Sequence, residues 1–129
     1  MGQARRGGVV LRIGAELRFL PAAVALRVAP SPRITVVPGA PAELVGIAVH
    51  EGAVVPVIAV GEGRDEMVVC QHAGELLGIV GGRVERTGTF DVVTAHPDLV
   101  EVDGANVRPL DVGGLYARVQ TGARSGRWG

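Results

Sequence analysis

Three histidines, one cysteine and a His-Glu pair are the residues of this chain that could do chemistry. His50-Glu51 would begin the zinc-protease motif H-E-x-x-H, whose two histidines hold the metal from one helical face at i and i+4. Position 54 is a valine, however, and Gly52 is a poor residue for a helix. The sequence therefore excludes this metal motif.

The remaining candidates stand alone. His50, His72 and His96 lie on separate segments, and none has a second ligand at the short spacing of a zinc site. Cys70 is the only cysteine, which excludes an intramolecular disulfide and a cysteine metal cluster. Cys70 and His72 would share one face of a strand, but the valines before Cys70 indicate a buried strand and an inert thiol. We predict no catalytic residue, metal or cofactor, and keep a small β-barrel enzyme or ligand-binding module using Cys70, His72 or His96 as an alternative.

The composition limits the class of protein. Of 129 residues, 47% are hydrophobic, and thirteen basic residues, all arginine, balance thirteen acidic ones. The charges alternate in sign along the chain, so no basic patch for nucleic acid is expected. No apolar run approaches the ~20 residues of a membrane-spanning helix. We expect a cytoplasmic protein of one domain that binds no nucleic acid and does not enter the bilayer.

The elements that must position these residues are short and rich in valine. Glycine, proline or Asp-Gly interrupts them, which is typical of all-β sandwiches and small barrels. We predict strands at residues 9–13, 17–20, 26–28, 34–37, 45–50, 54–60, 67–72, 75–80, 83–87, 99–102 and 107–112, and short helical turns at 21–24 and 114–119. The domain is expected to span 9–119, between a flexible N-terminus (1–8) and a flexible C-terminal tail (120–129).

One internal echo suggests two related halves. Residues 52–60 (GAVVPVIAV) resemble residues 104–112 (GANVRPLDV), and an acidic residue precedes each stretch. Because proline cannot donate to a strand ladder, Pro56 and Pro109 should lie at edges or bulges.

Several stretches of the first sixty residues carry a family resemblance. They are LRFLPAAVALRV at 17–28, Pro-Arg-Ile from Pro32, Val-Pro-Gly-Ala-Pro from Val37, Leu-Val-Gly-Ile at 44–47, and Gly52 with Pro-Val-Ile at 56–58. In type and spacing they resemble the CheW family of chemotaxis coupling proteins, and weaker matches continue to about residue 119.

The resemblance implies a fold and a role. The implied fold is two small five-stranded β-barrels around a shared hydrophobic core. The implied role is a non-enzymatic adaptor that couples the regulatory domain of a CheA-type histidine kinase to the cytoplasmic tip of chemoreceptors, in membrane-associated arrays. Binding would use strand and turn surfaces and an apolar groove between the barrels.

Two departures from the family pattern are informative. Family members commonly have V-x-E-V where this chain has residues 25–28 (ALRV), and N-L-R-G where it has residues 49–52 (VHEG). The acid has become Arg27 and the base has become Glu51. The resemblance implies that these positions lie close together and can pair across neighbouring strands, so we predict an ion pair of reversed polarity. The alternative is two unrelated substitutions at solvated positions.

The predicted partner-binding residues follow from the same resemblance. They are Arg27, Val28, Val49, His50, Glu51 and Gly52, with Arg83 and Val84 lining the groove between the barrels. The chain is short for the family, and Ala59 and Gly82 stand where relatives often carry acids. A diverged regulator that binds only the kinase or only the receptor is therefore a second expectation.

Overall fold

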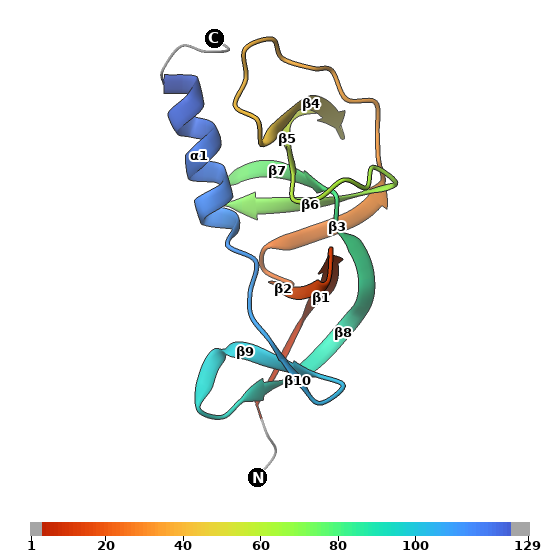
Figure 1. The fold of residues 1–129 in the computed structure, drawn as a ribbon, viewed down its shortest axis with the longest axis vertical. Helices are drawn as coiled ribbons and strands as arrows, with labels where there is room; N and C mark the ends of the chain where they lie inside the picture. The colour runs from red at the N-terminus through yellow and green to blue at the C-terminus, as the bar shows by residue number, and fades with distance from the viewer. Residues whose placement is uncertain (1–3, 125–129) are drawn as a thin grey trace.

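Two five-stranded β-sheets and one helix form the part of the chain that the computed structural model describes, residues 4–124 (Figure 1). The elements are β1 (Arg5–Ile13), β2 (Glu16–Pro21), β3 (Ala25–Pro30), β4 (Leu44–His50), β5 (Ala53–Ala59), β6 (Glu66–His72), β7 (Glu75–Val80), β8 (Arg83–Val93), β9 (His96–Val102), β10 (Ala105–Val107) and α1 (Val112–Arg124). The first sheet has the order β10-β9-β8-β1-β2, and the second has the order β3-β6-β7-β5-β4. All strand pairs are antiparallel except β5 with β7.

A single backbone bridge brings the edges of each sheet together into a barrel. In the first barrel, Phe19 of β2 bridges Pro109, just beyond β10. In the second barrel, Thr35 bridges Ile47 of β4, and each of these two residues donates its N–H to the other's carbonyl at 2.8 Å. The expectation of two small barrels is confirmed.

Alternation along the strands divides the apolar side chains among three clusters, because successive residues of a strand point to opposite faces. In β1, Val10 lies inside the first barrel, while Leu11 belongs to the cluster between the barrels. In β6, Val69 lies inside the second barrel and Val68 joins the same shared cluster. The shared cluster comprises Val9, Leu11, Leu20, Leu44, Ile58, Val68, Cys70, Leu77, Ile79, Val112, Leu115 and Val119. The barrels thus share an apolar core, as expected.

The helix α1 lies beside the second barrel in Figure 1 and completes the shared cluster. Val112, Leu115 and Val119 recur at i, i+3 and i+7, so one face of the helix is buried. At its start, the Gly114 N–H donates to Asp111 Oδ1 at 2.9 Å, which caps the first turn. Within residues 4–124, no helix is long and apolar enough to cross a lipid bilayer.

Three hairpins turn in the same way. Their two-residue turns have positive φ at both positions, which defines the type I′ turn that matches strand twist. The φ values are 49° and 81° at Glu51 and Gly52, 50° and 81° at Ala73 and Gly74, and 50° and 82° at Asp103 and Gly104. The echo seen in the sequence thus corresponds to two equivalent hairpin turns, one in each barrel.

Beyond these turns the echo ends. Pro56 lies opposite Ile47 in β5, before the pairing of β5 with β7 begins at Val57, so it occupies an edge as expected. Pro109 lies in the isolated bridge with Phe19. The predicted strand at 107–112 is wrong, because only Val107 belongs to β10 and α1 begins at the other end of the segment.

Other boundaries also differ from the expectations. Residues 34–37 form one bridge and no strand, because the nearby prolines, Pro32 and Pro38, cannot donate to a ladder. Residues 22–24 form a hydrogen-bonded β-turn, with the Val24 N–H on the Pro21 carbonyl at 2.8 Å, and no helix. Strand β8 continues to Val93, and β9 starts at His96.

Regular secondary structure extends beyond both predicted ends of the domain. Residues 5–8, predicted to be flexible, form the start of β1, where Arg5 pairs with Asp91 in β8. The helical turn predicted at 114–119 is part of a helix that ends at Arg124, within the predicted tail. Residues 1–3 and 125–129 lie outside the described residues.

Candidate functional site

The β4–β5 hairpin and strand β3 bring an arginine and a glutamate together at the surface of the second barrel. Arg27 Nη1 donates to Glu51 Oε1 at 2.8 Å, and the two side chains are 59% and 68% exposed. β3 and β4 are the two edges of the second sheet, so the ion pair spans the seam of this barrel. The structure thus contains the predicted ion pair between Arg27 and Glu51.

His50 lies against the same glutamate. Its Nε2 is 3.9 Å from Glu51 Oε2, and its side chain is only 16% exposed. His50 pairs with Ala53 directly before the turn. The geometry is that of a side chain packed at the base of a hairpin.

Exposed apolar side chains border the ion pair. Val49 and Val54 are cross-strand partners and are 64% and 65% exposed. Leu26, also exposed, lies at the bulge of β3 beside Arg27. We call Leu26, Arg27, Val49, His50, Glu51, Gly52 and Val54 the hairpin patch.

A small hollow adjoins the hairpin patch. It has a volume of about 270 Å³, and its lining includes Pro32, Arg33, Thr35, Val49 and Val54. Because the segment that bridges β4 forms one wall, the hollow lies at the seam of the second barrel.

Not every residue predicted for the patch belongs to it. Val28 is half-buried and packs against the shared cluster, because it follows Arg27 on β3 and so points to the other face. Leu26 and Val54 were missed by the sequence reasoning. The register of a two-residue hairpin, which places position 54 opposite Val49, could have indicated Val54.

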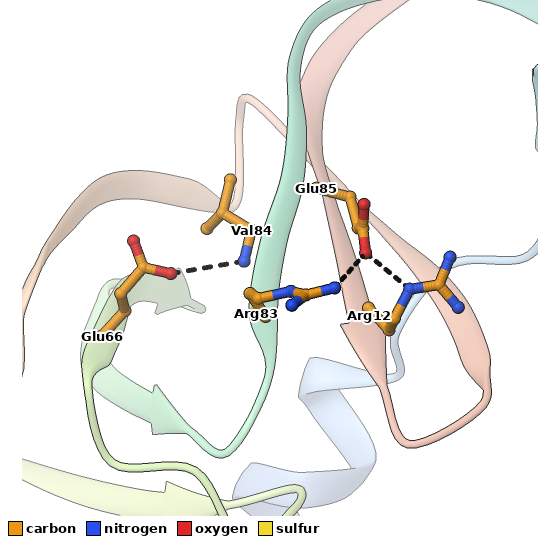
Figure 2. A network of polar contacts seen from close by, with 5 residues as sticks. All are labelled: Arg12, Glu66, Arg83, Val84 and Glu85. Carbon is orange, nitrogen blue, oxygen red and sulfur yellow. Dashed lines mark hydrogen bonds and ion pairs between the residues drawn. The ribbon is translucent and has the colours of Figure 1, made fainter.

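Arg83 and Val84 lie elsewhere, at the start of β8 (Figure 2). Arg83 Nη2 and Arg12 Nε both donate to Glu85 Oε1, at 3.0 and 2.5 Å. These two hydrogen bonds, Arg12 first, lower the pKa of Glu85. The Val84 N–H donates to Glu66 Oε1 at 3.4 Å, which links β8 to the start of β6.

This network borders a groove of about 610 Å³ between the two sheets. The groove is lined by Arg12, Gly14, Gly63, Asp65, Glu66, Gly81, Gly82 and Arg83. Glycine backbone and charged side chains contribute to this lining, and Val84 is half-buried and packs against the shared cluster beside it.

The candidate nucleophile is unsuited to chemistry. Cys70 is fully buried, and burial raises the pKa of its thiol to about 12. At neutral pH the thiol stays protonated, and the thiolate is the reactive form. His72 points away to the helix, where its ring lies 5.8 Å from the Tyr116 ring. Residues 4–124 hold no group of three or more histidine, cysteine or acidic side chains that could bind a metal ion.

Two curled five-stranded sheets joined by a common apolar cluster define a two-barrel class of protein. The fold is that of the scaffolding protein TtCheW from Thermoanaerobacter tengcongensis, whose crystal structure superposes with a TM-score of 0.74. The match covers 88% of this chain and 93% of TtCheW, at 19% sequence identity. No family model matches the sequence, and no curated protein matches it.

Proposed function

We propose that this protein is a non-enzymatic adaptor of a bacterial chemosensory system, which couples a CheA-type histidine kinase to chemoreceptors through protein contacts. The observation that carries the proposal is the two-barrel fold, shared with a scaffolding protein over nearly the full length of both chains. The buried, protonated thiol of Cys70 counts against the alternative of a small enzyme that uses it.

The hairpin patch is the proposed partner surface. Interfaces commonly combine apolar anchors with a polar rim. The patch has this composition, with Val49 and Val54 as exposed anchors beside the charges of Arg27 and Glu51. The hollow next to it offers a place for an apolar side chain of the kinase's regulatory domain or of the receptor tip.

The reversed ion pair is proposed to determine which partner binds. An exposed pair of this kind contributes only about 0–1 kcal/mol to folding, so stability alone hardly constrains its polarity. At an interface, juxtaposed like charges cost several kcal/mol and suppress the wrong partner. The receptor or kinase of this system would carry the complementary reversal opposite Arg27 and Glu51.

The groove at Arg83 is the proposed second surface. Gly82 lines it and stands where members of the resembled family often carry an acid. This departure supports the second candidate function, a regulator that binds only the kinase or only the receptor.

A titration with both partners separates these functions. Full-length protein would be titrated by calorimetry with the kinase regulatory domain and, separately, with the receptor tip encoded in the same genome. Saturable binding to both supports a coupler, and binding to one alone supports the restricted regulator. If neither binds at concentrations up to about 1 mM, the corresponding free energy is weaker than about −4 kcal/mol and the adaptor proposal fails.

Location is tested with the same partners. An adaptor that reaches receptor arrays from the cytoplasm should sediment with membranes that contain the receptors and stay in the supernatant with membranes that lack them. Equal sedimentation with both membranes would contradict recruitment through the receptor.

A further inference from the structure

Among the described residues, the seam of the first barrel is closed by one rung only. The Phe19 N–H donates to the Arg108 carbonyl at 3.0 Å, and the Leu110 N–H donates to the Phe19 carbonyl at 2.9 Å. Phe19 and Pro109 form the one isolated bridge recorded between these edges in residues 4–124. On the side of the β1–β2 turn, no further backbone hydrogen bond joins the two strand edges among the described residues.

Backbone groups of both edges face this open part of the seam. Alternate residues of a strand direct their N–H and C=O groups to the same side, so Leu17 faces the seam as Phe19 does. A second rung would join the Leu17 N–H to the Asn106 carbonyl and the Arg108 N–H to the Leu17 carbonyl. Instead, Arg18 Nη1 donates to the Leu17 carbonyl at 2.8 Å, and the rung is absent.

A hollow of about 490 Å³ lies at this place, and its charge is mostly positive. Three arginines line it, Arg12, Arg18 and Arg108, against one acid, Glu16. Arg18 pairs with Glu16 at 2.6 Å, and Arg12 pairs with Glu85. Arg108 is exposed, and its side chain has no acidic partner among the described residues.

We propose that this seam binds an extended, acidic segment of a partner protein, which adds along the edge of β2. The segment's backbone would accept from the Leu17 N–H and donate to the Asn106 carbonyl, as in other cases of strand addition. A carboxylate of the segment would pair with the Arg108 guanidinium, where charge-assisted and bidentate hydrogen bonds are strong. A small anion would have no N–H donor to offer the Asn106 carbonyl. The proposal does not depend on the adaptor function.

A short capped peptide of alternating Glu and Thr is the probe. Alternation places all its carboxylates on one side of an extended chain. In NMR titrations of the full-length, isotope-labelled protein, this peptide should shift the amide signals of Leu17, Asn106 and Arg108. The same peptide with Gln for Glu should bind about tenfold more weakly or worse, because it cannot make the charged pairs.

Two arginine variants locate the site. Arg108→Gln should weaken binding of the Glu/Thr peptide about tenfold. Arg33→Gln is the matched control, since Arg33 lines the hollow of the second barrel, and it should leave the affinity unchanged. Raising the salt from about 0.05 M to about 0.5 M should weaken binding by screening the charges.

Three results would overturn the proposal. The first is equal affinity for the Arg108→Gln variant and the unchanged protein, and the second is amide shifts confined to residues away from the seam. The third is sodium sulfate that binds as tightly as the peptide and shifts the same amides, which would make the seam an ordinary anion site with no need for an extended segment.

Discussion

The β4–β5 hairpin of the second barrel and the β9–β10 hairpin of the first are built alike. Each turn places an acidic residue at φ near 50° and a glycine after it, Glu51-Gly52 in one and Asp103-Gly104 in the other. Each acid pairs with an arginine of its own barrel, Glu51 with Arg27 at 2.8 Å and Asp103 with Arg86 at 2.6 Å. All four charged side chains are more than half exposed.

The hairpins differ in the pair of side chains next to the turn. On the outer face of the second barrel this pair is Val49 with Val54. At the same register of the first barrel it is Glu101 with Asn106, both exposed and polar. An exposed ion pair at a hairpin tip can therefore simply face solvent and does not by itself mark a binding surface. We therefore propose that the exposed apolar pair makes the hairpin patch a docking surface, because its burial would drive association.

The interiors of the barrels also differ, and Phe19 gives the largest expected effect. The first barrel holds Phe19 and Phe90 edge to face, with ring centroids 5.9 Å apart, and Phe19 also forms the rung that closes the seam. Phe19→Ala should lower the free energy of unfolding by about 3–5 kcal/mol, because it leaves a large cavity. Urea denaturation measures this loss. Leu17→Ala on the same strand is the control, and a larger loss there would show that the barrel interior is misassigned.

The next largest expected effect is on partner binding, and the variant that tests it gives one hairpin the side chains of the other. Val49→Glu with Val54→Asn gives the second hairpin the polar pair of the first. Affinity for the partner that binds the hairpin patch should fall by about 2 kcal/mol or more, roughly thirtyfold, because the apolar anchors are lost and a carboxylate must be desolvated. Stability should change by only about 0.5 kcal/mol, since both positions are exposed.

The reciprocal variant is the control for that exchange. Glu101→Val with Asn106→Val changes the first hairpin in the opposite sense and should leave the affinity for the same partner unchanged. Equal losses from the two exchanges would mean that the patch is not the binding surface.

Two glycines of the second barrel test whether the Thr35–Ile47 bridge holds its seam together. A methyl group on Gly46 would collide with the Thr35 carbonyl, which is backbone of the closing bridge. A methyl group on Gly78 would first meet the flexible end of the Met67 side chain, its Sδ at 2.5 Å. Gly46→Ala should therefore cost about 1–3 kcal/mol of stability and Gly78→Ala less. Thermal denaturation of both variants checks the order, and the reverse order would contradict a seam held by the Thr35–Ile47 bridge.

The smallest effect concerns pH. Arg12 and Arg83 lower the pKa of Glu85 in the folded chain, so its ionised form favours folding above the unfolded pKa. This contribution is lost as the pH falls through the folded pKa. The unchanged protein should be more stable than Glu85→Gln at neutral pH, and the difference should shrink on acidification below about pH 4. A difference that grows towards low pH would have the wrong sign.

Local pattern predicted much of the fold. The bounds of β7, Glu75–Val80, agree with the prediction because Gly74 and Gly81 bracket a run that contains two leucines, an isoleucine and a valine. The helix α1 was underestimated because Gly113 and Gly114 lower helix propensity, which burial of its apolar face overrides.

Long-range geometry limited the prediction of the candidate site. Glu51 and Arg27 were predicted as a pair through the family resemblance, because the local sequence does not show that β3 and the β4–β5 hairpin meet at the seam. The exposure of Leu26 depends on a bulge in β3 that no local pattern announces. Arg83 was predicted at the groove between the barrels through the same resemblance, and its place at the start of β8 puts it there.

The central claim is that the ion pair of the second hairpin determines partner choice while its counterpart in the first barrel does not. A double-mutant cycle with Arg27→Glu and Glu51→Arg, read out as affinity for the kinase regulatory domain and for the receptor tip, tests it most directly. Arg86→Asp with Asp103→Arg is the matched cycle in the first barrel.

The account predicts that either single reversal in the second barrel weakens binding about tenfold or more. It also predicts a coupling energy of about 0.5 kcal/mol or more between the two positions. The cycle in the first barrel should leave both affinities unchanged. Strictly additive effects at positions 27 and 51, or equal losses from the two cycles, would contradict the account.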